Sequence, residues 1–96
     1  MPGHPTGAQL RAARGLLNLS VLQLSEITGL ALNTIKRAEG TNDFAPITAA
    51  NAMALVAAYE ARGVSFVAAD ETLGAGARLR LDAAEPFARR RLPTQE

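Results

Sequence analysis

The side chains with the most directional chemistry lie together in one short stretch of the chain. Asn33, Lys36 and Arg37 are spaced so that they share one side of an α-helix. An amide can offer a donor and an acceptor to the edge of adenine, and lysine or arginine can reach guanine acceptors or a phosphate. Leu32 could touch a thymine methyl group, and Thr34 could donate to a phosphate or a base. These five residues are the candidate contacts to double-stranded DNA.

The sequence offers little that could catalyse a reaction or hold a metal ion. The chain has no cysteine, and its one histidine, His4, cannot build a histidine metal site or a catalytic triad. Asp70 and Glu71 are adjacent in an expected loop, with no base–nucleophile pair beside them. No glycine loop of the GxxxxGK type occurs. We therefore expect a protein without enzymatic activity, cofactor or metal.

Length and composition favour one small domain. The 96 residues are 48% hydrophobic and 20% charged, which is enough apolar content for a packed core. The formal net charge is only +1, so the total charge does not indicate a nucleic-acid partner. No apolar run approaches the roughly 18–20 residues of a membrane span, and no signal pattern opens the chain. Together with the lack of cysteine, this favours a cytoplasmic location without membrane contact.

Apolar periodicity and turn residues predict a mainly α chain with a short C-terminal β-hairpin. Thr6 and Ser20 are good N-caps, Asn18-Leu19 makes a short turn after the first expected helix, and a glycine follows each of the other three. The expected helices span about 7–17, 21–28, 31–39 and 47–62, and the expected strands span 64–67 and 77–81. The chain then divides into a flexible arm (1–6), a helical domain (7–62), a hairpin (63–81) and a flexible basic tail (82–96).

The stretch 21–38 fits two short helices joined by a tight turn. Ser25 is the small residue that lets the second helix pack closely, and Gly29 suits the turn. Thr28 stands where a larger apolar residue is expected. The apolar contacts between the helices are Leu24, Leu30, Ile35 and Ala38. The pattern is typical of a helix-turn-helix, whose second helix enters the DNA major groove; an ordinary solvated helix face is the alternative explanation of its outward residues.

The stretch LRAARGLLNLSVLQLSEITGLALNTIKRAEG resembles the first three helices of the Xre/Cro-like helix-turn-helix family of bacterial and phage regulators. The resemblance extends over about residues 7–62. More loosely, ARGVSF followed by GARLRL is similar to a small bacterial subgroup with a C-terminal hairpin. The Xre/Cro-like resemblance implies a four-helix DNA-binding domain, a nucleoid-associated location and insertion of helix 31–39 into the major groove. It also implies a structural ion pair between Arg14 and Glu39.

Two positions depart from the family pattern. Val21 replaces a glutamine that commonly meets a phosphate, and Ala31 replaces a serine or threonine N-cap. Because backbone contacts supply most non-specific affinity, one copy alone should bind DNA modestly. The remaining candidate phosphate contacts are Ser20, Gln23, Arg78 and Arg80. The run 89–91 of three arginines is either a further phosphate contact or part of a solubilising tail.

The expected hairpin could also serve dimerisation. Val64, Phe66, Leu79 and Leu81 could cover helix 47–62, and the free strand edge could pair with a second copy. Two-fold symmetry would present two recognition helices to successive major grooves about 34 Å apart. We therefore expect a homodimer whose interface is formed either by the hairpin or by helix 47–62.

The sequence predicts a sequence-specific transcriptional regulator without catalysis. Repression by occluding a promoter is the default for so small a chain, and activation stays open. The alternative is a protein-interaction module, such as an antitoxin, that binds a protein partner through its C-terminal part. Phe87 and Leu92 are the only large apolar anchors in residues 82–96, which counts against that alternative.

Overall fold

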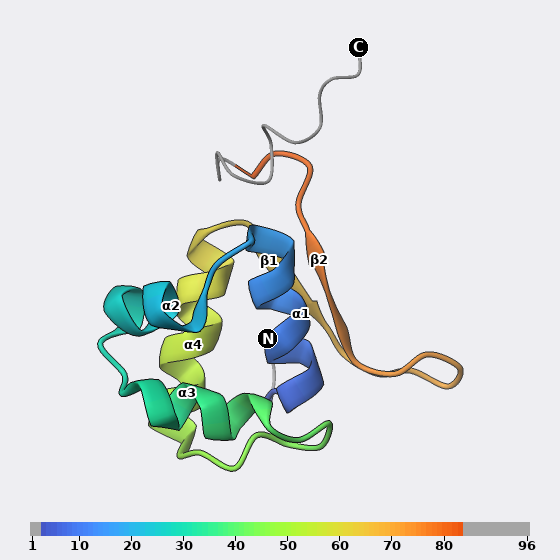
Figure 1. Ribbon diagram of the computed structural model, residues 1–96. Coiled ribbons are helices and arrows are strands. Elements are labelled where there is room, and N and C mark those ends of the chain that lie inside the picture. The colour runs from blue at the N-terminus through green and yellow to red at the C-terminus, as the bar shows by residue number, and fades with distance from the viewer. Residues whose placement is uncertain (1–2, 84–96) are drawn as a thin grey trace.

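The computed structural model describes residues 3–83, which form four helices followed by a two-stranded antiparallel hairpin (Figure 1). The elements are α1 (Gly7–Leu17), α2 (Val21–Thr28), α3 (Leu32–Glu39), α4 (Ala49–Ala61), β1 (Val64–Val67) and β2 (Gly76–Leu79). The expected mainly α architecture with a small hairpin is therefore present. None of the helices in this part of the chain is long and apolar enough to cross a bilayer.

The same sequence device starts α1 and α2. The Thr6 hydroxyl accepts from the Gln9 amide nitrogen at 3.0 Å, and Gln9 Oε1 accepts from the Thr6 amide nitrogen at 2.9 Å. Ser20 and Gln23 repeat this reciprocal pair at 3.0 and 2.8 Å. Each pair satisfies two backbone donors that a helix start would otherwise leave open. These capping boxes fix where both helices begin.

Apolar side chains from all four helices and the first strand make one core. Tyr59 of α4 lies at its centre, fully buried, with its ring 6.0 Å from that of Phe66. Its hydroxyl group is buried with no hydrogen-bond partner among the described residues, and burial raises the pKa of Tyr59. The largest other members are Leu10, Leu17, Leu24, Ile35, Leu55 and Val64.

The hairpin packs on two helices, not on α4 alone as expected. β2 lies against α1 and β1 lies against α4. The buried Gln9 side chain joins the hairpin to α1, because its Nε2 donates to the carbonyl oxygens of Val67 at 3.2 Å and Gly76 at 3.1 Å. Leu81 does not cover a helix: it is 96% exposed. The register pairs Val64, the first residue of β1, with Leu79, so Leu81 lies beyond the paired part of the hairpin.

Two of the expected boundaries need correction. Residues 3–6 are not a free arm, because Pro5 is buried and His4 Nε2 donates to the carbonyl oxygen of Ala45 at 2.8 Å. Helix α4 begins at Ala49, two residues later than expected, because Thr48 adopts an extended backbone and caps it. The expected basic tail lies almost entirely outside the described residues, and so does the arginine run 89–91.

Gly7 holds the start of α1 against the loop that follows α3. A Cβ atom at this position would lie 2.7 Å from the carbonyl oxygen of Ala38 and would also clash with that of Thr41. Gly15, in the same helix, has nothing within 4 Å of its Cβ position. Gly7 is therefore required by a close backbone approach, whereas Gly15 is not.

We predict that Gly7→Ala lowers the free energy of unfolding by about 1–3 kcal/mol, because backbone atoms cannot yield as a flexible side chain can. Gly15→Ala is the matched control and should raise it by about 0.5–1 kcal/mol, since alanine favours the helix. Urea denaturation followed by circular dichroism measures both. Equal effects of the two substitutions would contradict the close approach at Gly7.

Comparison of Gln9 with Gln23 distinguishes two contributions of Gln9, which are its contact with the hairpin (the hairpin anchor) and its part in a capping box. Both complete a capping box, but only Gln9 reaches the hairpin. We predict that Gln9→Ala lowers the free energy of unfolding by about 1–3 kcal/mol, because it removes the buried amide that donates to both hairpin carbonyl groups. Gln23→Ala should cost less than about 0.5 kcal/mol, as for other surface substitutions. Hydrogen exchange of the β1 and β2 amides should rise only in Gln9→Ala; protection that stays unchanged there argues against the anchor.

Candidate functional site

Helix α3 divides its side chains sharply between the core and the surface. Ile35, Ala38 and Glu39 are buried on its inner side. Asn33, Lys36 and Arg37 are exposed, and Leu32 and Thr34 are half-buried at the borders of the same outer face. Within residues 3–83, no hydrogen bond or ion pair engages the side chains of Asn33, Lys36 or Arg37. The structure thus brings the predicted base-contacting residues together with their polar groups directed outward.

The turn before α3 is closed by hydroxyl groups. Gly29 has a φ of 77°, a left-handed conformation that suits glycine, and its amide donates to the carbonyl oxygen of Ser25 at 2.8 Å. The Ser25 hydroxyl donates to the carbonyl oxygen of Leu30 at 2.6 Å, and the Leu30 amide donates to the Thr28 hydroxyl at 3.2 Å. Thr28, which departs from the expected apolar residue, therefore ties the turn instead of filling the core.

The far end of α3 is held by an ion pair with α1. Arg14 Nε and Nη2 donate to the two carboxylate oxygens of Glu39 at 2.9 and 2.8 Å, and this hydrogen bonding raises the pKa of Arg14. Nη1 of the same guanidinium donates to the carbonyl oxygen of Leu19 at 3.1 Å. The Glu39 side chain is only 8% exposed and that of Arg14 26% exposed. One arginine therefore joins α1, the α1–α2 turn and α3.

Sequence reasoning missed a second arginine that holds this end of α3. Arg11 Nη1 donates to the carbonyl oxygens of Glu39 at 2.6 Å and Thr41 at 3.2 Å, and Nη2 donates to Asn42 Oδ1. A cation over the carbonyl end of a helix satisfies acceptors that have no partner inside the helix. The available signal is its position one turn before Arg14, on the side of α1 that faces α3.

The candidate phosphate contacts fall into two groups, one at the start of α2 and one on the hairpin. In the capping box of α2, Ser20 Oγ and Gln23 Oε1 both accept hydrogen bonds, so this box leaves the Ser20 hydroxyl hydrogen and Gln23 Nε2 as the donors that a phosphate would need. Arg80 is paired with Asp82 at 3.0 and 2.8 Å on the surface. Arg78 is exposed on β2, which lies on the side of α1 away from α3 (Figure 1), and Arg80 directly follows that strand. The two hairpin arginines therefore do not extend the outer face of α3.

The Arg14–Glu39 pair can be tested against an exposed pair of the same geometry. Arg14→Ala should lower the free energy of unfolding by about 3–5 kcal/mol, because it leaves a buried carboxylate without its partner. Glu39→Ala should cost less, about 1.5–3 kcal/mol, since the partly exposed guanidinium keeps its water and its bond to Leu19.

Arg80→Ala is the control, because it breaks a two-point pair with Asp82 that is open to solvent. We expect it to leave the unfolding midpoint in urea nearly unchanged. Should Arg14→Ala be as mild as Arg80→Ala, the ion pair does not hold α3 in place.

Comparison with known proteins does not assign this chain to a family. A scan against protein-family models found no match, and neither did a search of curated proteins.

Proposed function

We propose that this protein is a sequence-specific DNA-binding transcriptional regulator of the Xre/Cro-like helix-turn-helix type. In this proposal α3 enters the major groove of double-stranded DNA, and two copies act together as a homodimer. The observation that carries the proposal is a short helix held at both ends, whose outer face bears Asn33, Lys36 and Arg37 with no side-chain partner among residues 3–83.

Each outward residue has a role that its chemistry suits. The Asn33 amide can pair with an adenine edge, and Lys36 or Arg37 can reach guanine acceptors or phosphates. Asn33 and Arg37 are four residues apart, so they stand one above the other at the middle of the outer face. Thr34 and the half-buried Leu32 border them, where a hydroxyl group can meet a phosphate and a methyl group a thymine.

The contacts that hold α3 at both ends favour recognition of specific bases over non-specific electrostatic binding to DNA. Side chains discriminate between bases only when the helix that carries them is held in a fixed position. Here the hydroxyl-closed turn holds one end, and Arg11 and Arg14 hold the other. Lys36 and Arg37 are two free cations, which is few for binding to phosphates. Two copies on one duplex would double these contacts, and occupying a promoter in this way would repress transcription.

The proposal predicts a separation between DNA affinity and stability. Asn33→Ala combined with Arg37→Ala should weaken binding to a duplex selected from a random library by about 2–6 kcal/mol, because two base contacts are lost. The free energy of unfolding should change by less than about 0.5 kcal/mol, since both side chains are on the surface. Gel-shift titration and urea denaturation measure the two quantities.

Arg78→Ala is the control of equal charge, since Arg78 is exposed on β2 away from α3. It should bind the selected duplex nearly as tightly as the unaltered protein does. Equal weakening by Arg78→Ala and by the double variant would mean that the protein responds only to total charge. Absence of any selected duplex, together with a co-purifying protein, would favour the protein-interaction alternative.

A further inference from the structure

Helix α4 is apolar on its outer side as well as on its inner side. Leu55 and Tyr59 are buried, and the exposed positions on the opposite side include Ala50, Met53 and Ala57, which recur at helical spacing. Met53 is 71% exposed although it is large and apolar. A helix side that faces only water normally carries polar residues. The outer side of α4 is therefore suited to a contact with another apolar surface.

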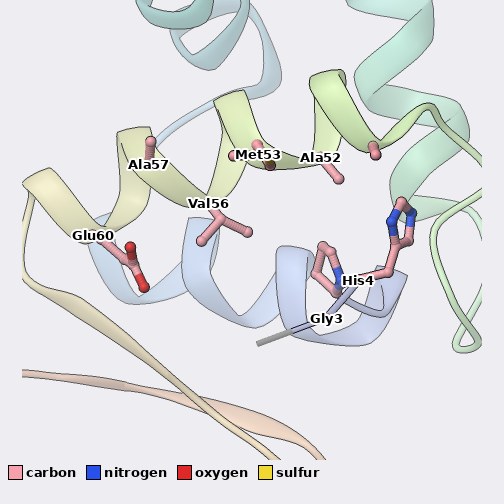
Figure 2. A pocket seen from close by; sticks show the side chains of 9 residues that line it. Gly3, His4, Ala52, Met53, Val56, Ala57 and Glu60 are labelled. Atoms are coloured by element: carbon pink, nitrogen blue, oxygen red, sulfur yellow. The ribbon is translucent and has the colours of Figure 1, made fainter. Parts of the chain in front are cut away.

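A groove lies directly beside this side of α4. It runs between α4 and the N-terminal segment, with a volume of about 540 Å³. Figure 2 shows Val56 pointing toward this groove, with His4 and Gly3 on the opposite wall. Met53, Ala52 and Pro5 also line the groove, and its one carboxylate is that of Glu60 (Figure 2). A projecting apolar side chain and a hollow that could receive one thus adjoin each other on a single surface.

We infer that this surface, the outer side of α4 with its adjoining groove, is the interface between two copies of the chain. A two-fold axis brings the same patch of both copies together, so the patch must be complementary to itself. Met53 of each copy would enter the groove of the other, while Ala50 and Ala57 let the two helices approach closely. This inference rests on the proposed homodimer and names its surface.

The hairpin is a weaker candidate for the same role. Leu73 is 69% exposed, but it follows Asp70 and Glu71 in the loop between the strands. A two-fold contact there would place the carboxylates of both copies close together, and like charges across an interface repel. On the outer side of α4, Glu60 is the only charged residue. Charge therefore favours α4 over the hairpin loop.

The size of the surface predicts a weak dimer. The 13 residues of α4 make a helix about 20 Å long and about 10 Å wide. Such a helix face covers about 200 Å², so even with the groove it is smaller than the roughly 800 Å² that each partner buries in a typical specific interface. We therefore expect monomer and dimer to exchange in solution at micromolar concentrations. Two recognition helices on one duplex would then favour the dimer when DNA is bound.

Sedimentation equilibrium of the full chain without DNA tests the inference. Met53→Asp should weaken the dimer at least about tenfold, because it places a charge at the centre of an apolar interface. Leu73→Asp is the matched control, with nearly the same exposure and the same added charge, and should leave dimerisation unchanged. Thermal unfolding of both variants should show that they fold, since neither side chain belongs to the core.

Cysteine cross-linking gives an independent readout, because the unaltered chain has no cysteine. Ala57→Cys should form a disulfide-linked dimer under mild oxidation, and Leu73→Cys should do so much less. A monomer at all concentrations overturns the inference, and so does loss of the dimer in Leu73→Asp but not in Met53→Asp. DNA binding is measured separately with the α3 variants, so a failed interface and a failed DNA-binding proposal can be told apart.

Discussion

The structure depends on one buried ion pair at the end of α3. Burying the Glu39 carboxylate is unfavourable unless a cation meets both of its oxygens, and Arg14 does so while also bonding to Leu19. The pair therefore works only when α1, the α1–α2 turn and α3 are all in place. This is a constraint on geometry more than a source of stability, since replacing such pairs with apolar residues is often neutral or better.

That constraint allows α3 to be short and still well positioned. Eight residues would not hold a helix on their own, so its position must come from tertiary contacts. Hydroxyl groups close the turn before it, and Arg11 occupies the carbonyl groups after it. Both ends of α3 are held by contacts and its inner side packs on the core, so its outer polar residues are not needed to position the helix. The outer side of α4 differs, because it is largely apolar and yet does not pack against the rest of the described chain.

The sequence predicted local features well and tertiary contacts less well. The N-caps, Gly29 and the alternation of apolar residues are local signals, so the helices and strands lie close to their expected positions. The contact of Arg14 with Glu39 was available from the family resemblance. The contact of Gln9 with the hairpin could not be predicted from the sequence, because nothing in the local sequence distinguishes Gln9 from Gln23. Leu81 was misplaced because alternation alone does not show where the partner strand begins.

The central claim is that the outer face of α3 reads base sequence in duplex DNA. In vitro selection from a random duplex library tests it most directly, using the full chain. The account predicts enrichment of a palindrome whose half-sites are about 34 Å apart, one turn of the double helix. The absence of any enriched sequence, at protein concentrations at which the chain is dimeric, would contradict it.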